Sequence, residues 1–106
     1  MINIILVCNA GMSTSVLVKK MRDESEKRGI DTQINAYSVE TLEEVLKTND
    51  ADCILVGPQI LYMLSNIKKI VSNQCPVDVI DMKDYGTING VAVLDKALSM
   101  KIAPLK

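Results

Sequence analysis

The residues best suited to chemistry follow the first apolar run of the chain. Cys8 ends the run 4–7, and small or polar residues with one methionine come next: Asn9, Ala10, Gly11, Met12, Ser13, Thr14 and Ser15. A helical pattern starts at Val16, which indicates a strand, a tight loop and a helix. Free N–H groups at a helix N-terminus bind anions, and the helix dipole favours a thiolate held there. The segment therefore predicts a nucleophilic sulfur beside a phosphate-sized cradle.

Cys8 also admits a structural interpretation. A cysteine at the end of a buried strand usually serves as a small apolar core residue. Core packing, however, does not require the polar segment 11–15 directly after that strand. The residues alone therefore leave a reactive Cys8 and a structural Cys8 both open.

Composition limits the size of the protein and its partners. The chain has 106 residues and contains neither Phe nor Trp, so we expect one domain over residues 1–106 with an aliphatic core. A formal net charge of −1 argues against a nucleic-acid partner or an anionic membrane surface. No apolar run reaches the length of a membrane span, and the N-terminus lacks a signal-peptide pattern. We therefore expect a cytoplasmic protein with no segment inserted in a membrane.

The chain contains no histidine, which excludes Ser-His-Asp and Cys-His catalysis and zinc sites that use His. Its three cysteines, Cys8, Cys53 and Cys75, are odd in number and far apart, as expected of reduced thiols. Cys53 lies inside an apolar run and is expected in the core, whereas Cys75 precedes a proline and is expected to be structural or incidental. No Cys-x-x-Cys pair or carboxylate cluster is present, so we expect no metal and no cofactor.

Hydrophobic periodicity predicts four strands that alternate with helices. Residues 3–7 and 53–56 are continuously apolar, as in central strands covered on both faces, whereas residues 30–36 alternate like a half-exposed edge strand. A short fourth strand is expected at 77–80 and a loop at 81–86. Helices are expected at 14–28, from a capping box at Thr41 to about 47, at 58–71 and at 91–102. Helical spacing in the last two links Leu61, Leu64, Ile67, Lys68 and Val71, and places Val91, Leu94, Leu98 and Ile102 inward.

These elements predict an α/β fold with a single open four-stranded parallel sheet and helices on both faces. Right-handed crossovers and the burial pattern favour the strand order 2-1-3-4. The order reverses between strands one and three, and ligands of open α/β sheets bind at that point, outside the carboxyl ends of the strands. The loops that meet there are 8–15 and 57–59, which also makes Gln59 a candidate neighbour of Cys8.

The loop after Cys8 lacks the common nucleotide-binding patterns, because it contains neither Gly-x-Gly-x-x-Gly nor Gly-Lys-Ser/Thr. It is most similar to the Cys-x5-Arg-Ser/Thr loop of cysteine phosphatases, in which the Arg grips the phosphoryl oxygens. Thr14 stands at the Arg position, and residues 8–15 carry no positive charge. Since phosphoryl transfer depends on neutralising developing charge, we expect this loop to hold a phosphoryl group on Cys8 and to hydrolyse it poorly. A carrier of phosphoryl groups needs this property.

The whole chain resembles the IIB component of bacterial sugar phosphotransferase systems, of the lactose/cellobiose (diacetylchitobiose) family. The segments that carry the resemblance are the loop 8–15 with Leu17, Lys20 and Met21, then Val56-Gly57-Pro58-Gln59-Ile60 with Tyr62 and Met63, then 76–81, and Tyr85-Gly86 before the last helix. The resemblance implies a four-stranded parallel sheet of order 2-1-3-4. It also implies a phosphotransferase that forms a phosphocysteine intermediate.

By this resemblance, Cys8 accepts a phosphoryl group from a phosphohistidine of the IIA component. It passes the group to a sugar, such as a cellobiose-, chitobiose- or lactose-like β-disaccharide, bound in the membrane component IIC. Backbone N–H groups of residues 9–15 would hold the phosphoryl oxygens, assisted by the hydroxyls of Ser13, Thr14 and Ser15. Each of these hydroxyls is equally suited to capping the first helix.

Other residues are expected around this loop. An apolar docking rim would comprise Met12, Ile60, Leu61, Tyr62 and Met63, although most of these suit the core, and for Leu61 the core is the favoured interpretation. We expect Tyr85 to close the edge of the pocket and Asp84 to be an ordinary surface residue. Two other functions stay open: a low-molecular-weight cysteine phosphatase or arsenate-reductase-like enzyme, and a regulatory domain in which Cys8 never carries phosphate.

Overall fold

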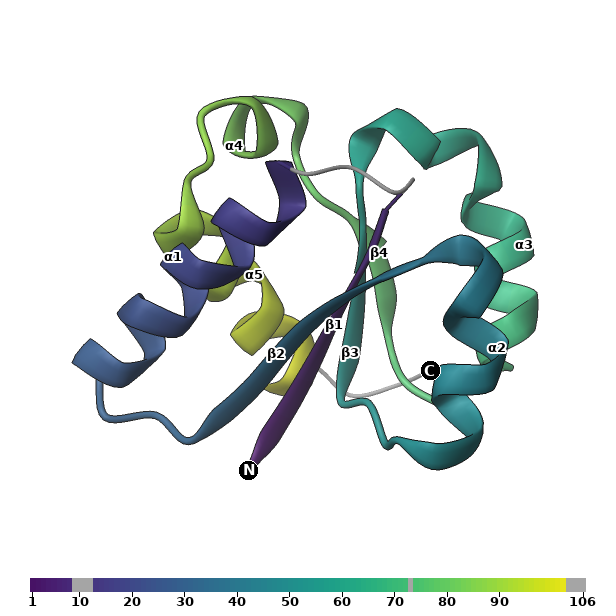
Figure 1. Ribbon diagram of the computed structural model, residues 1–106, viewed down its shortest axis with the longest axis horizontal. Helices are drawn as coiled ribbons and strands as arrows, with labels where there is room; N and C mark the ends of the chain where they lie inside the picture. The colour runs from purple at the N-terminus through teal and green to yellow at the C-terminus, as the bar shows by residue number, and fades with distance from the viewer. Residues whose placement is uncertain (9–12, 73, 103–106) are drawn as a thin grey trace.

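A computed structural model of the chain describes residues 1–8, 13–72 and 74–102. One parallel sheet runs through the molecule in the order β2-β1-β3-β4 (Figure 1). Its strands are β1 (Ile2–Cys8), β2 (Thr32–Ser38), β3 (Cys53–Val56) and β4 (Val77–Val79). The predicted fold class, strand order and third strand are confirmed, while β2 lies two residues later than expected.

Helices cover both faces of the sheet (Figure 1). One face packs against α1 (Ser13–Lys27) and α5 (Gly90–Ile102), and the other packs against α2 (Val39–Thr48) and α3 (Leu64–Val71). A 3-10 helix, η1 (Pro58–Met63), follows β3, and a short helix, α4 (Met82–Gly86), follows β4. Among the residues that the structure describes, every helix is too short or too polar to cross a bilayer.

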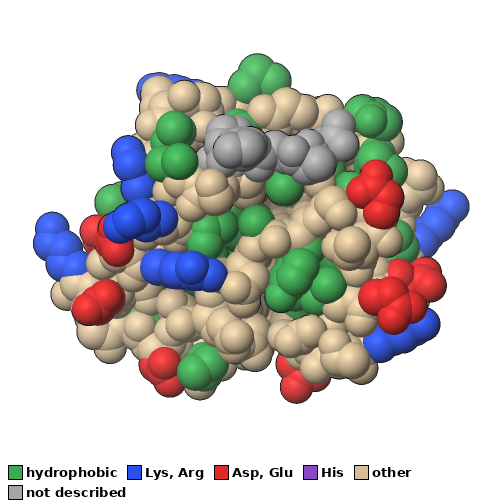
Figure 2. Space-filling view, viewed as in Figure 1, with side chains coloured by type: hydrophobic (Ala, Val, Ile, Leu, Met, Phe, Trp, Pro, Cys, Tyr) green, Lys and Arg blue, Asp and Glu red, His purple; other side chains and the backbone are tan. Residues whose placement is uncertain are grey.

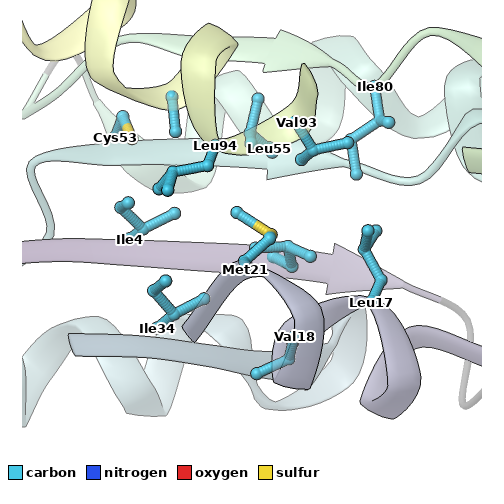
Figure 3. Packing of buried hydrophobic residues seen from close by; sticks show 12 residues of the cluster. Ile4, Leu17, Val18, Met21, Ile34, Cys53, Leu55, Ile80, Val93 and Leu94 are labelled. Atoms are coloured by element: carbon cyan, nitrogen blue, oxygen red, sulfur yellow. The ribbon is translucent and has the colours of Figure 1, made fainter. Parts of the chain in front are cut away.

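Alternation along the two central strands divides the core between the two faces of the sheet. Ile4 of β1 and Leu55 of β3 point towards α1 and α5, whereas Ile5 and Ile54 point towards α2 and α3. Figure 3 shows the first cluster, in which side chains of α1 and α5 converge on the sheet. Its labelled members are Ile4, Leu17, Val18, Met21, Ile34, Cys53, Leu55, Ile80, Val93 and Leu94. The core is aliphatic, as the composition predicts, and Cys53 lies fully inside it.

The third predicted helix is divided at its start. Pro58 begins the 3-10 helix, and Ile60 leaves helical geometry at φ −115° and ψ 28° before α3 begins. The periodicity of an unbroken α-helix therefore does not apply to the first turns. Ile67 and Val71 are buried as expected, but Leu61 and Lys68 are exposed.

Three further local predictions were wrong. The second helix begins after Ser38, not at a capping box on Thr41, whose hydroxyl donates to the Ser38 carbonyl. The expected loop 81–86 contains α4, because the Asp81 carboxylate accepts a hydrogen bond from the Lys83 N–H and caps the helix. In α5, Val91 is exposed. Among the described side chains of α5, Val93, Leu94 and Ala97 are buried, and the side chain of Ile102 lies outside the described ones.

In each edge strand, one carbonyl that points away from the sheet accepts a hydrogen bond from a positively charged side chain of a helix. Parallel pairing with β1 leaves the Ile34 carbonyl of β2 facing outward, and the Arg22 guanidinium of α1 donates to it. On β4, Lys96 of α5 donates to the Val79 carbonyl at 2.7 Å. Such contacts limit the tendency of an edge strand to pair with another chain. They also tie α1 and α5 to opposite edges of the same sheet.

Gly90, the first residue of α5, allows α5 to approach α1 closely. A Cβ built on Gly90 would lie 2.7 Å from the Lys20 Cβ and 2.9 Å from the Lys20 carbonyl carbon. Gly90→Ala therefore forces the helices apart and should lower the free energy of unfolding by about 1–3 kcal/mol, measured by urea denaturation. Gly86→Ala is the matched control, since a Cβ there meets nothing within 4 Å. Equal stability of the two variants would contradict this packing.

Cys75 should make stability depend on pH in the alkaline range. Burial, and then the nearby charge of Asp52, raise the pKa of the Cys75 thiol from 9.0 to about 11. The unfolded chain thus releases this proton near pH 9, whereas the folded protein retains it until about pH 11. Stability from this group is complete below pH 9 and is lost as the pH rises through 11, in total about 2–3 kcal/mol.

Cys75→Ala should flatten this part of the pH profile relative to wild type, measured by denaturation at pH 8 to 11. Lysines titrate in both proteins, so the difference between the two profiles isolates Cys75. Parallel profiles would show that the thiol does not keep its proton in the folded state.

Candidate functional site

The structure places Cys8 at the carboxyl end of a central strand, where the strand order reverses. Cys8 is the last residue of β1 and pairs in register with Ser38, the last residue of β2. Its side chain is 8% exposed, and its thiol donates a weak hydrogen bond to the Tyr37 carbonyl at a distance of 3.8 Å. On the other side, the Gly57 N–H donates to the Val7 carbonyl at 2.9 Å. The end of β1 is therefore fixed from both neighbouring strands.

The helix that follows Cys8 is suited to an anion. α1 begins at Ser13 and has no acidic residue in its first turn, so the helix supplies no carboxylate of its own to neutralise its N-terminal dipole. Residues Asn9, Ala10, Gly11 and Met12, which we expect to form the phosphate-binding loop with Ser13, Thr14 and Ser15, lie outside the described residues. What the structure shows is a sulfur five residues before the start of a helix whose own first turn holds no carboxylate.

Thr14 joins this site to the segment after β4. Its side chain is 2% exposed, and its hydroxyl lies 3.0 Å from the hydroxyl of Tyr85 in α4. Ser15, by contrast, is exposed. The structure therefore brings Tyr85, 71 residues away along the chain, to the first turn of α1. The Thr14 hydroxyl is engaged in a contact between two helices.

Gln59 lies on the other side of Cys8, in the first turn of η1. The position that a Cβ on Gly57 would occupy is 3.3 Å from the Gln59 Oε1 and 3.9 Å from the Cys8 Cβ. The amide oxygen of Gln59 and the Cβ of Cys8 therefore both lie within 4 Å of the position that a side chain on Gly57 would occupy. This arrangement supports the expectation that Gln59 neighbours the site.

The five residues that the sequence suggested for an apolar docking surface differ in their exposure. Ile60 is 1% exposed and belongs to the core, because the kink at this residue turns it inward. Leu61 is 55% exposed, contrary to the favoured core assignment, and Tyr62 is 77% exposed. Met63 is partly buried against the core and Met12 lies outside the described residues. Of the four that the structure describes, Leu61 and Tyr62 therefore present a substantial apolar surface.

Two exposed apolar residues were missed from the sequence. Val16 of α1 is 44% exposed and Met82 of α4 is 71% exposed. Figure 2 shows apolar side chains at the end of the molecule where Figure 1 places α4 and η1. The position of Met82 near the site could have been predicted from the sequence. Met82 follows the fourth strand, and in a parallel sheet it must therefore lie at the same end as Cys8. We define the apolar rim as Val16, Leu61, Tyr62 and Met82.

Two aspartates, Asp81 and Asp84, follow the end of β4. Asp81 caps α4, and Asp84 is partly buried, with its backbone carbonyl accepting a hydrogen bond from the Asn89 N–H at 2.8 Å. Within the described parts of the chain, no three Asp, Glu, Cys or His side chains gather in a group able to hold a metal ion. The arrangement can thus supply a nucleophilic sulfur, a helix N-terminus and neutral polar groups.

Comparison with known proteins agrees with this geometry. Residues 3–96 match the family model described as PTS system, lactose/cellobiose specific IIB subunit. The chain is 35% identical over 100 residues to an oligo-β-mannoside-specific EIIB component of Bacillus subtilis (strain 168), which covers 93% of this chain and 95% of that protein. It is 40% identical over 98 residues to a galactose-specific EIIB component of Lactococcus lactis subsp. cremoris (strain MG1363), with 89% and 91% covered.

A solved structure gives the same result in three dimensions. The solution structure of a cellobiose-specific phosphotransferase IIB component protein from Borrelia burgdorferi superposes with a TM-score of 0.77 and 34% sequence identity. The match covers 95% of this chain and 92% of that one. Sequence and fold therefore agree along nearly the whole chain, including the strand that ends at Cys8. The protein belongs to the lactose/cellobiose-specific IIB subunits of the phosphotransferase system.

Proposed function

We propose that Cys8 is the phosphoryl-carrying residue of this IIB subunit. IIB subunits are phosphotransferases that act with IIA and IIC components in the transfer of a phosphoryl group to a sugar. The observation that carries the assignment is the position of Cys8, at the carboxyl end of β1 and five residues before the first residue of α1. Backbone N–H groups of residues 9–15 receive the phosphoryl oxygens in this proposal, and no cofactor or metal takes part.

The reaction consists of two displacements at phosphorus. The Cys8 thiolate attacks the phosphohistidine of IIA, so that an S–P bond forms and the N–P bond breaks. The bonding electron pair returns to the imidazole nitrogen, which takes up a proton. A sugar hydroxyl oxygen then attacks the phosphocysteine, the S–P bond breaks, and the thiolate is regenerated while the hydroxyl proton leaves to solvent or a base. N-terminal helix N–H groups stabilise the charge on the phosphoryl oxygens during both steps.

Transfer is favoured over hydrolysis because the site lacks the charge that a phosphatase uses. Thr14 stands where cysteine phosphatases have an arginine, and its buried hydroxyl is directed to Tyr85. Asp81 caps α4, so we do not assign it as a general base that activates water, and we give Asp84 no role in either displacement. Gln59 places a neutral amide beside Cys8 and does not repel a phosphoryl group. Tyr85 closes the edge of the pocket on the side of α4.

The donor and the acceptor dock in turn on the face that carries Cys8. The phosphorylated IIA protein is the donor and the membrane permease IIC holds the sugar, which places this single domain of residues 1–106 in the cytoplasm. Relatives at 34–40% identity are named for oligo-β-mannoside, galactose and cellobiose. A β-disaccharide such as cellobiose, chitobiose or lactose is our proposal for the sugar, with the choice made mainly by IIC.

Phosphorylation of Cys8 can be tested by intact-mass measurement. Incubation with phosphoenolpyruvate, the general phosphotransferase proteins and a cognate IIA should add one phosphoryl group, which peptide mapping places on Cys8. Cys8→Ser should show no addition, because a serine hydroxyl is a far weaker nucleophile than a thiolate at neutral pH. Addition without IIA, addition at another residue, or none with an active IIA would contradict the proposal.

The apolar rim should determine how well the donor docks. Leu61 and Tyr62 are the two residues of the rim that lie in η1. Either Leu61→Asp or Tyr62→Asp should raise the KM for phosphorylated IIA about tenfold, because an interface side chain of this kind contributes about 1–2 kcal/mol to binding. Both side chains are largely exposed, so folding should be little affected. Val91→Asp is the matched control, because Val91 is also exposed but lies on α5. A similar KM in all three variants would show that IIA docks elsewhere.

A further inference from the structure

A hydrogen bond joins the first turn of α1 to the segment after β4. The hydroxyls of Thr14 and Tyr85 lie 3.0 Å apart, and Thr14 is almost completely buried. Buried hydroxyls are costly to leave unpaired, so this contact has a defined geometry. The two helices that it connects come from opposite ends of the chain.

Tyr85 is itself held firmly. Its ring packs against the hydrophobic cluster between the sheet and α1 and α5. The short helix that carries it is capped at its start by Asp81, which accepts from the Lys83 N–H at 2.8 Å. At its end, the Thr87 N–H donates to the Lys83 carbonyl at 3.0 Å. A ring fixed in this way presents its hydroxyl at one place.

The rest of α1 is anchored further along the helix. Leu17, Val18 and Met21 pack in the core, from one turn beyond Thr14 onwards. The first turn of a helix is prone to fray, because its N–H groups have no partners within the helix. The Tyr85 hydroxyl therefore supplies an anchor at the one turn of α1 that lies nearest to Cys8.

We infer that Tyr85 is a positioning residue that fixes the first turn of α1 through Thr14 and so holds the N–H groups of that turn, which face the phosphoryl group in the proposed reaction. This inference rests on the proposed role of Cys8. Tyr85 acts through Thr14 and forms no bond to phosphorus in either displacement. A small misplacement of groups that stabilise a transition state lowers the rate strongly, so a single hydroxyl can influence transfer from outside the loop.

The inference predicts a rate effect that depends on the hydroxyl pair. Tyr85→Phe and Thr14→Val each remove one hydroxyl and keep the shape of the side chain. Each should slow the phosphorylation of Cys8 by phosphorylated IIA about tenfold, as expected for the loss of one such hydrogen bond. The double variant should be no slower than either single variant, because both changes remove the same interaction.

Thr14→Ser separates the hydrogen bond from packing. Serine keeps the hydroxyl but loses a buried methyl group, whereas valine keeps the volume and loses the hydroxyl. Thr14→Ser should transfer the phosphoryl group faster than Thr14→Val despite a lower stability, because it keeps the hydroxyl that pairs with Tyr85. Thr48→Val is the control for removing a threonine hydroxyl, because Thr48 is exposed at the end of α2.

Hydrogen exchange gives a readout that does not depend on function. In an α-helix the N–H groups of Leu17 and Val18 donate to the carbonyls of residues 13 and 14, so their exchange reports fraying of the first turn. Exchange of both should be about tenfold faster in Tyr85→Phe. If wild type is not phosphorylated on Cys8, the proposed function fails while exchange still tests the anchor. Wild-type exchange and transfer rates in Tyr85→Phe, or additive effects in the double variant, would overturn the inference.

Discussion

The site depends on the parallel register of β1. Seven consecutive residue pairs join β1 to β2, from Ile2 with Thr32 to Cys8 with Ser38, and four pairs join β1 to β3. A slip of one residue would exchange the two faces of the strand and place Ile4 and Ile5 in each other's clusters. The apolar alternation therefore prevents the slip, and the same register puts the sulfur at the edge where β2, β3 and α1 meet. The position of the Cys8 sulfur is therefore determined by the packing of apolar side chains that lie away from the site.

A consequence is that the site is assembled from elements that the sheet brings to one edge. Cys8 is the last residue of β1, whereas Gln59 lies in η1 after β3 and Tyr85 lies in α4 after β4. Their separation in sequence is large, but the carboxyl ends of parallel strands necessarily coincide. Contacts between the connections then refine the site, as the hydroxyl pair of Thr14 and Tyr85 does. The sheet gives the approximate position and the side-chain contacts give the final one.

The fold was largely predictable because its signals are repeated along the chain. The continuous apolar run 53–56 matches β3, and the helix expected at 14–28 matches α1 closely. Local predictions were wrong where a single contact or kink overrides the hydrophobic pattern of the sequence. The kink at Ile60 interrupts the helix, and Leu61 is exposed although the core was the favoured interpretation; the cap from Asp81 made a helix where a loop was expected. The partnership of Thr14 with Tyr85 depends on tertiary packing, which no local pattern encodes.

The central claim is that the site holds a phosphoryl group without releasing it to water. The most direct test is to isolate the protein phosphorylated on Cys8 and to follow the loss of phosphate with time, with and without membranes that contain the permease and its sugar. We predict a phosphocysteine that persists in buffer and discharges rapidly to the sugar when permease and sugar are both present. Rapid loss to water in the purified protein, unaffected by permease and sugar, would identify a phosphatase and contradict the carrier.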